Sequence, residues 1–431
     1  MREEQEVIWT KVLLVGLDTG EEEDFEHSME ELGKLAEAAY KRVVGIITQK
    51  METVNKALYI GSGKVAEVKE LATQMEAEEI IFDNALTPSQ MRNLGNELDM
   101  PVVDRTGLIL DIFALRARTA EAKLQVETAR LQYMLPRLMG MRENLSRQGG
   151  TGGSMSNKGA GETKLELDRR KIEHRISELK KELSTVVKNR ATMRKKREQS
   201  RIPQVALVGY TNAGKSTIMN RLVERYGESR EKTVLEKDML FATLDTNVRL
   251  IKTEDKSSFF LADTVGFINK LPHGLIKAFQ STLEEVKYAD LLLQVVDFSD
   301  EHHKQHIDVT QETLKEIGAG DIPQIIVYNK ADLCGMDDIP KVSGNKIYMA
   351  AGCECGLEEL IRMINNFTHA DWIEETFLIP FDKGNLVSFF MEHSIVLEEE
   401  YLENGVKLRV SCHICDADKY GGYRLGASPE Q

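Results

Sequence analysis

The chain has 431 residues, of which 42% are hydrophobic and 29% charged, and its formal net charge is −14. The length and composition are typical of a globular protein with about three domains, and the negative charge argues against a nonspecific nucleic-acid coat. Five cysteines in so long a chain do not form a disulfide framework. No apolar run approaches the roughly 20 residues of a membrane span, and the first residues, MREEQEVIW, lack a signal-peptide pattern. We therefore expect a cytoplasmic protein without a membrane span, and a partial association with membranes stays open.

The first 103 residues alternate between apolar strands and helical patterns. The predicted strands read VLLVGL, RVVGIIT, EIIFD and PVVD, and helices are expected near 24–40, 64–76 and 88–98. This alternation predicts a parallel sheet in an N-terminal α/β domain, residues 1–103. The stretch GSGK at 61–64 lacks the full spacing of a phosphate-binding loop, so we interpret it as a turn that begins a helix.

Two long helical segments are predicted next, near 105–145 and 162–199. Apolar residues of the second segment follow a 4-3-4-3 spacing, which is typical of a coiled-coil seam: Ile172, Ile176, Leu179, Leu183 and Val186. The first segment offers a partner seam of Leu124, Leu131, Leu135 and Leu138. Pro136 is expected to kink or divide the first helix. Between the segments lies the glycine-rich stretch RQGGTGGSMSNKGAGE, so residues 104–200 are predicted to form an antiparallel helical hairpin with a Gly-rich tip loop, rather than an interdomain linker.

The second of these segments reverses the overall charge. Residues 164–201 contain 14 Lys and Arg against 6 Asp and Glu. Two readings stay open: a solvated helix face, or a surface that contacts RNA. The candidate RNA-binding residues are Arg147, Lys158, Arg194, Lys195, Lys196 and Arg197.

Residues 201–370 are expected to form a third domain. The strands QVALVGY, FFLADT, LLLQVVD, QIIVYNK and KIYMAA alternate with helical stretches, which predicts a doubly wound, mostly parallel sheet. Residues 371–431 are expected to form a small α+β domain, in which the strand FLIPF precedes a short helix. The hairpin VLEEEYLENGVKLRVSC then turns at Asn404 and Gly405.

The stretch GYTNAGKS at 209–216 matches the phosphate-binding loop G-x-x-x-x-G-K-[ST], and it lies between a predicted strand and a predicted helix. Backbone N–H groups of such a loop bind phosphate at the helix N-terminus. Lys215 is expected to reach the β- and γ-phosphates and Ser216 to bind Mg²⁺. The residues of this loop that we expect to contact the nucleotide are Gly209, Asn212, Ala213, Gly214, Lys215, Ser216 and Thr217.

The stretch Asn329-Lys330-Ala331-Asp332 predicts guanine as the base. The Asp332 carboxylate can accept hydrogen bonds from two guanine donors that adenine lacks, so ATP is disfavoured. In the later stretch MAAGCECG, Ala350 and Ala351 are expected to lie at the base, where Ala351 offers a backbone N–H to the guanine O6 atom. The order of these motifs identifies a GTPase.

The stretch LADTVGFI contains the Asp-x-x-Gly motif, with Asp263 and Gly266. The next residue in Ras-like enzymes is a glutamine that orients the attacking water, whereas here it is Phe267. Upstream, Thr243 is the preferred candidate for binding Mg²⁺ and the γ-phosphate, and Thr246 is the alternative. We therefore expect Lys215, Thr243 and Gly266 to be catalytic, and Ser216, Thr243 and, through water, Asp263 to hold Mg²⁺.

Several stretches resemble the HflX family of ribosome-associated GTPases along nearly the whole chain. They are IFDNALTPSQMRNL, VVDRTGLILDIFALRA, KLQVETARLQYMLPRL, GETKLELDRRKIEHRI, VALVGYTNAGKST, LFATLD and ADTVGFI. The chain departs from the family pattern in two places. It has GAGE where the family usually has GPGE, and in LDTN a threonine follows the Asp where the family commonly has a proline. The resemblance implies the domain order given above and binding to the large (50S) ribosomal subunit, with the hairpin loop near the peptidyl-transferase region. It also implies splitting or rescue of stalled or idle ribosomes, and a hydrophobic residue in the glutamine position.

A hydrophobic residue there predicts slow hydrolysis of GTP by the free protein, with the ribosome as activator. Two other functions stay open: a regulatory switch with a non-ribosomal protein partner, and an ATP-dependent RNA-remodelling activity of the N-terminal domain. The C-x-x-C pair Cys412 and Cys415 and the pair Cys353 and Cys355 are interpreted as ordinary thiols rather than zinc ligands. We expect a monomer.

Overall fold

The computed structural model describes residues 9–20, 24–147, 158–199, 202–227, 240–241, 244, 247–253, 257–270, 272, 275, 280–336 and 338–425. The chain divides into two compact units. The first comprises Met1–Lys188, Lys237–Asp245 and Ile268–Ser281, and the second comprises Asn189–Glu236, Thr246–Phe267 and Thr282–Gln431. Among the described helices, none combines the length and the apolar character that crossing a membrane requires. The four domain boundaries expected from the sequence remain a prediction.

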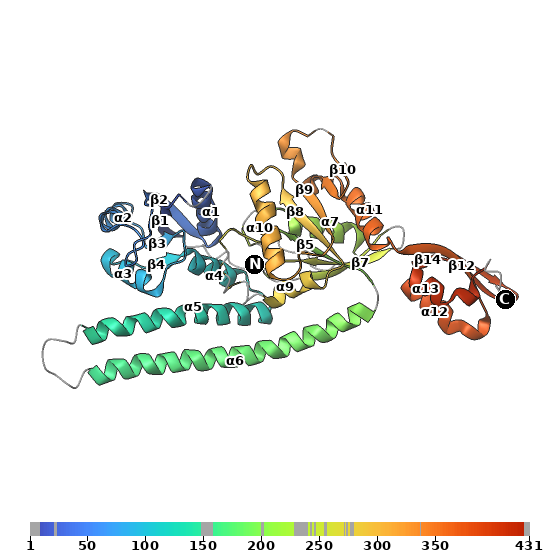
Figure 1. Ribbon diagram of the computed structural model, residues 1–431, viewed down its shortest axis with the longest axis horizontal. Helices are drawn as coiled ribbons and strands as arrows, with labels where there is room; N and C mark the ends of the chain where they lie inside the picture. Colours follow the sequence, from blue (N-terminus) through green and yellow to red (C-terminus); the bar gives the residue numbers. More distant parts are fainter. Residues whose placement is uncertain are drawn as a thin grey trace, which may run out of the picture. The chain divides into compact units, whose positions relative to one another are not determined.

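The first unit contains a four-stranded parallel sheet with the order β2-β1-β3-β4 (Figure 1). Its strands are β1 (Thr10–Asp18), β2 (Lys41–Lys50), β3 (Glu79–Phe82) and β4 (Val102–Asp104). The helices between them are α1 (Phe25–Ala38), α2 (Ser62–Gln74) and α3 (Pro88–Leu98). The order of these elements along the chain confirms the predicted strand–helix alternation. Fully buried residues such as Leu13, Ile80 and Phe82 form the core. Gly61 is the N-cap of α2, so the GSGK stretch does begin a helix.

The single helix predicted near 105–145 is two helices, α4 (Arg105–Arg116) and α5 (Ala120–Arg147). The prediction was wrong at the break because Ala117 has an extended backbone, with ψ of 109°. The Thr119 hydroxyl then accepts a hydrogen bond from the Ala122 N–H group at 3.1 Å, which is the cap of a new helix. Pro136 does not divide α5, which continues through it.

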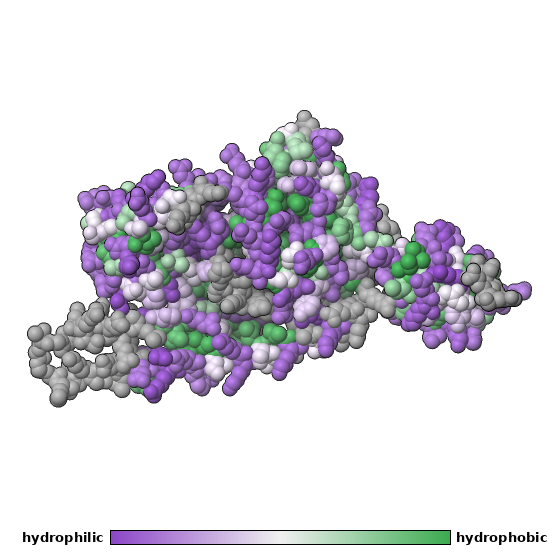
Figure 2. All heavy atoms as spheres, viewed as in Figure 1, coloured by the Kyte–Doolittle hydropathy of each residue, from purple (hydrophilic) through white to green (hydrophobic). Residues whose placement is uncertain are grey.

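The helices α5 and α6 (Lys158–Gln199) form the predicted antiparallel hairpin (Figure 1). Arg175 of α6 donates to Glu127 of α5, with Nε and Oε1 2.9 Å apart. The predicted seam on α6 faces inward in part, because Ile176 and Leu179 are buried while Glu178 and Lys180 are exposed. The other predicted seam residues whose side chains the structure describes are half-buried: Ile172, Leu183 and Val186 on α6 and Leu124, Leu131 and Leu135 on α5. Apolar side chains gather over α5 on a surface that is otherwise mostly hydrophilic (Figure 2).

The second unit contains a seven-stranded sheet with the order β10-β11-β9-β8-β5-β7-β6. The strands are β5 (Gln204–Gly209), β6 (Asn247–Lys252), β7 (Ser258–Asp263), β8 (Leu291–Asp297), β9 (Gln324–Asn329), β10 (Lys341–Ser343) and β11 (Lys346–Tyr348). The five inner strands are parallel, as predicted, and the edge strands β6 and β10 are antiparallel. The sequence analysis missed both edge strands, because an edge strand with few buried residues has no continuous apolar run. The helices are α7 (Lys215–Tyr226), α9 (Gln280–Lys287), α10 (His303–Glu316) and α11 (Leu357–Thr368).

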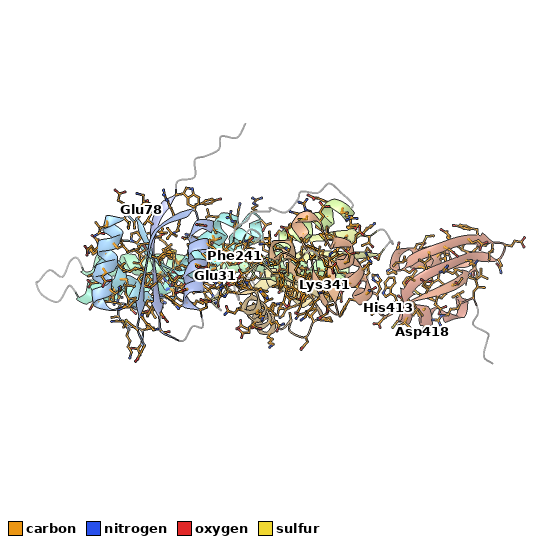
Figure 3. The ribbon with its side chains drawn as sticks, turned by 90° about the horizontal axis from the view of Figure 1, so that it is seen from above. Glu31, Glu78, Phe241, Lys341, His413 and Asp418 are labelled. Carbon is orange, nitrogen blue, oxygen red and sulfur yellow. The ribbon has the colours of Figure 1, made fainter. Side chains whose placement is uncertain are left out.

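The C-terminal part of the second unit is a three-stranded antiparallel sheet with the order β12-β14-β13 (Figure 3). Its elements are β12 (Trp372–Ile379), α12 (Gly384–His393), β13 (Ile395–Leu402), β14 (Gly405–His413) and α13 (Ile414–Lys419). The predicted hairpin is present, but Leu402 pairs with Gly405, so its turn is Glu403 and Asn404, one residue earlier than predicted. Gly405 is the first residue of β14, and it must be a glycine because a Cβ atom there would lie 2.4 Å from the Ile379 carbonyl oxygen.

Candidate nucleotide-binding site

The phosphate-binding loop joins β5 to α7, and its glycines are required by close contacts. Gly209 has φ of +142°, and a Cβ atom on it would lie 2.1 Å from the Val295 carbonyl oxygen. Gly214 has φ of +95°, and a Cβ atom on it would lie 2.2 Å from Asn329 Nδ2. A side chain at either position would push the loop away from β8 or from Asn329, so both glycines set the shape of the loop.

Lys215 is the first residue of α7, and its side chain is buried against the loop. Its Nζ atom donates to the carbonyl oxygens of Gly209 at 3.0 Å and Tyr210 at 2.6 Å. Burial lowers the pKa of Lys215 to about 8, and the nearby Asp263 carboxylate partly opposes that shift. The ammonium group is therefore held at the phosphate-binding loop, in an environment where an added negative charge would favour its protonated form.

Ser216 and Asp263 meet at the position expected for the metal. The Ser216 hydroxyl donates to Asp263 Oδ2 at 2.9 Å, and Asp263 is fully buried at the end of β7. Hard oxygen ligands of this kind suit Mg²⁺, which usually keeps several waters and binds substrate phosphates as well. Thr217 follows on α7 and is partly buried. Thr243 and Thr246 lie outside the described residues.

The Asp-x-x-Gly segment is bonded to the phosphate-binding loop through Phe267. The Phe267 N–H donates to the Gly209 carbonyl oxygen at 3.1 Å, and its own carbonyl accepts from the Thr211 N–H at 2.8 Å. A Cβ atom on Gly266 would lie 2.9 Å from the Thr211 Cα atom and 3.0 Å from Lys215 Nζ. The Phe267 side chain is only 2% exposed, so it belongs to the core of the unit.

Asn329 and Lys330 hold the loops of the site together. Asn329 Nδ2 donates to the Ala213 carbonyl oxygen at 3.0 Å. Lys330 Nζ donates to the Asn212 carbonyl oxygen at 3.0 Å and pairs with Asp297 Oδ2 at 2.6 Å. The sequence analysis missed Asp297, although its position at the end of the buried strand LLLQVVD was a signal for it.

The backbone N–H groups of Ala350 and Ala351 are both bonded within the protein. The Ala350 N–H donates to the Cys355 carbonyl oxygen at 3.1 Å, and the Ala351 N–H donates to Asn329 Oδ1 at 2.9 Å. The expectation that Ala351 donates to the guanine O6 atom stays a prediction, and it requires the Ala351 N–H to exchange its bond to Asn329 for one to the base.

Asp332 lies in a short 3-10 helix, Ala331–Cys334, directly after β9. Its carboxylate is exposed, and Oδ2 accepts a hydrogen bond from the Cys353 thiol at 3.7 Å. A thiol is a weak donor. The carboxylate can therefore exchange this bond for the stronger N–H donors of guanine.

The predicted RNA-binding residues differ in their surroundings. Arg194 of α6 lies 3.8 Å from the centre of the Tyr288 ring and pairs with Glu284 of α9 at 3.4 Å, and its side chain is 12% exposed. These contacts make Arg194 a packing residue between α6 and α9, which does not support its assignment to RNA. Lys195 is exposed. The side chains of the other candidates lie outside the described residues: Arg147, Lys158, Lys196 and Arg197.

Comparison with known proteins identifies the family. Three family models match the chain: "GTP-binding GTPase N-terminal" over residues 26–114, "GTP-binding GTPase Middle Region" over 116–197 and "50S ribosome-binding GTPase" over 204–330. The GTPase HflX of Caldanaerobacter subterraneus subsp. tengcongensis is 43% identical over 408 residues, covering 94% of this chain and 92% of that protein. The GTPase HflX of Escherichia coli is 37% identical over 414 residues, covering 94% of each chain.

The solved structure of a GTP-binding protein from Sulfolobus solfataricus in complex with GDP is 25% identical, covers 84% of this chain and 99% of that chain, and has a TM-score of 0.44. The sequence similarity to the curated relatives extends over almost the whole chain. It shows that the chain belongs to the HflX family of GTPases and is an enzyme that hydrolyses GTP.

Proposed function

We propose that this GTPase acts on the ribosome: it binds the large (50S) subunit and splits or rescues stalled or idle 70S ribosomes, in a role related to stress. Two findings support the proposal. The family model that matches the nucleotide-binding region carries the description "50S ribosome-binding GTPase". The hairpin of α5 and α6 presents a long helix on which basic residues such as Arg170 and Lys171 are exposed.

The observation that carries the proposal is the buried Phe267. In Ras-like enzymes a glutamine at this position orients the water that attacks the γ-phosphate. Phenylalanine has no hydrogen-bonding group, and this one is 2% exposed with its backbone bonded to Gly209 and Thr211. The free protein therefore lacks a side chain at this position that can orient the water, and a partner must complete the site.

The remaining residues of the site bind the nucleotide and stabilise charge. Lys215 holds an ammonium group against the β- and γ-phosphates, and the Gly266 N–H donates to the γ-phosphate. Ser216, Thr243 and, through water, Asp263 would hold Mg²⁺, which neutralises charge on the phosphate oxygens when bound. These groups stabilise the transition state without orienting the nucleophile, so hydrolysis is slow until the ribosome orders the site.

Single-turnover hydrolysis of GTP tests the proposal. The rate is measured for the free protein, with 50S subunits, with 30S subunits and with an equal concentration of unrelated RNA. We expect slow hydrolysis alone and acceleration by 50S subunits only. Fast hydrolysis by the free protein with no effect of 50S subunits would contradict the proposal, since another residue would then orient the water.

Sedimentation distinguishes the proposal from a switch that acts on a non-ribosomal protein. The protein is centrifuged with 70S ribosomes and with separate subunits, in the presence of a GTP analogue or GDP. We expect co-sedimentation with 50S subunits in the analogue state and an increase of free subunits over 70S particles. Binding without any change in the ratio of 70S particles to subunits would support the 50S subunit as the partner and contradict the splitting activity.

A further inference from the structure

Shortly after the Asp-x-x-Gly motif, the chain contacts a buried acidic side chain through Lys270. Lys270 lies four residues after Gly266, and its Nζ atom is 2.5 Å from Asp83 Oδ2 and 2.8 Å from Ser28 Oγ. Lys270 and Asp83 both belong to the first unit, which includes Ile268–Ser281. The covalent chain therefore passes from the nucleotide site directly to this ion pair.

Asp83 is part of a buried charged cluster. It is fully buried just after β3, and Arg105, the first residue of α4, donates to its Oδ1 atom at 2.7 Å. The other end of the Arg105 guanidinium pairs with Glu31 of α1 (Glu31 is labelled in Figure 3). These ion pairs join two carboxylates, one guanidinium and the Lys270 ammonium. Because a buried carboxylate is costly unless paired, the cluster favours the conformation in which Lys270 stays docked.

A second segment flanking the site contacts α4, the helix of Arg105, directly. Phe241 lies two residues before Thr243, in the segment Lys237–Asp245 that also belongs to the first unit. The Phe241 side chain is 2% exposed, and its ring lies 4.8 Å from that of Phe113 at an angle of 87°. Phe113 and Arg105 are both on α4, so this helix contacts Phe241 directly and is joined to Lys270 through Asp83 (Phe241 is labelled in Figure 3).

The first residues of α4 are also joined to the hairpin. Asp104 caps α4 by accepting from the Gly107 N–H at 2.8 Å. The same carboxylate accepts from the Tyr133 hydroxyl at 2.6 Å and from Arg137 Nη2 at 3.0 Å, both on α5. Asp104 is fully buried. A movement of α4 would therefore break these bonds or move α5 with it.

We propose that α4 carries the nucleotide state to the helical hairpin, with Phe241 holding one flanking segment directly on α4 and Lys270 holding the other on Asp83, the partner of Arg105. A γ-phosphate that draws Gly266 and Thr243 towards itself competes with these two contacts. The nucleotide then shifts the equilibrium between docked and released segments by its differential affinity for the two states. This inference goes beyond the proposed function because it concerns the free protein.

Hydrogen exchange of the full chain, without ribosomes, tests the inference. Exchange of residues 105–137 is compared between GDP and a non-hydrolysable GTP analogue. We expect a difference in the wild type, its reduction by at least about twofold in Lys270→Met, and its retention in Lys270→Arg. The affinity for the analogue relative to GDP should rise roughly fivefold in Lys270→Met, because binding no longer competes with docking.

The matched control is Lys11→Met, which removes an ion pair with Glu76 on the exposed surface of the same unit. Asp83 keeps Arg105 and Ser28 as partners in Lys270→Met, so the unit should stay folded. Should that variant fail to fold, Ser28→Ala and Phe241→Leu answer the same question with smaller changes. The inference is overturned if the wild type shows no nucleotide-dependent exchange in residues 105–137, or if these variants behave like Lys11→Met. Because ribosomes are absent, neither result bears on the 50S proposal.

Discussion

Lys215 should make nucleotide binding depend on pH. Its pKa is lowered to about 8 by burial, and phosphate oxygens beside it would raise the pKa again. Below about pH 8 the lysine is charged in both states, so affinity is flat; above it, binding takes up a proton and affinity falls as the pH rises. The lowered pKa also affects the stability of the fold. Below about pH 8 the folded protein buries a charged lysine, which lowers the free energy of unfolding, and this loss is relieved as the pH rises from about 8 towards the ordinary pKa of lysine.

Calorimetry of GDP binding in two buffers of different ionisation enthalpy measures the proton uptake directly. We expect little uptake at about pH 6.5 and a fraction of a proton at about pH 8.5. Lys215→Met should remove the pH 8.5 uptake and weaken binding. Equal uptake at both pH values in the wild type would show that another group titrates on binding.

Asp332 should determine the preference of the site for guanine over other bases. Its exposed carboxylate is bonded only weakly, to the Cys353 thiol, and so can accept two hydrogen bonds from guanine. Asp332→Asn should weaken GDP binding by roughly 10- to 100-fold and strengthen xanthosine diphosphate binding, because the amide donates to the xanthine carbonyl. Fluorescent nucleotide titration measures both, with Asp338→Asn as a control at a nearby exposed carboxylate. If Asp332→Asn leaves both affinities unchanged, the guanine site lies elsewhere.

At the scale of elements, Asp104 joins the start of α4 to α5 by accepting hydrogen bonds from both helices. Burial, and secondarily the Asp104 carboxylate, raise the pKa of Tyr133 well above its usual value, so the hydroxyl stays a donor. Tyr133→Phe should lower the free energy of unfolding by about 1–3 kcal/mol, because a buried carboxylate loses one donor. Urea denaturation measures the change, and Tyr401→Phe, on a side chain that is 70% exposed, is the control. Equal stability of the two variants would mean that Arg137 and the backbone suffice to satisfy Asp104.

Adjacent residues of α6 should separate packing from RNA binding. Arg194→Ala removes the Tyr288 and Glu284 contacts and should lower the free energy of unfolding. Lys195→Ala should leave stability unchanged and reduce the salt dependence of ribosome binding by about one unit of slope, the value for one phosphate contact. Sedimentation over a salt series measures the slope. An unchanged slope in Lys195→Ala would favour the solvated helix face for this stretch.

At the scale of the whole molecule, the hairpin tip should serve an activity other than affinity. Deleting residues 149–158 removes a glycine-rich stretch with a single lysine, so most of the charge that binds RNA remains. We expect 50S binding to fall only slightly and splitting of 70S particles, followed by light scattering, to be lost. As a control for loop length, a second variant replaces the same stretch by Ser and Gly residues without deleting any position. Full splitting by the deletion variant would assign the activity to another part of the chain.

The sequence by itself determined the nucleotide chemistry. The phosphate-binding loop, Asp-x-x-Gly and Asn-Lys-x-Asp are contiguous stretches whose glycines and side chains act through local backbone geometry, so their residues could be read off the chain. The strand–helix alternation of residues 10–104 could also be predicted from the sequence, because its buried strands are continuous apolar runs. The spacing found the centre of the hairpin seam, where Ile176 and Leu179 are buried, whereas the other described residues of the predicted seam are only half-buried.

Only the tertiary structure decided which polar groups are already used. The Ala351 N–H is taken by Asn329, 22 residues away in the chain, and Lys270 meets Asp83 across 187 residues. Arg194, whose sequence neighbours are basic, packs against Tyr288 instead of facing solvent. In each case the partner is distant in sequence, and hydrogen bonding and burial depend on distances in space that no local pattern of residues encodes.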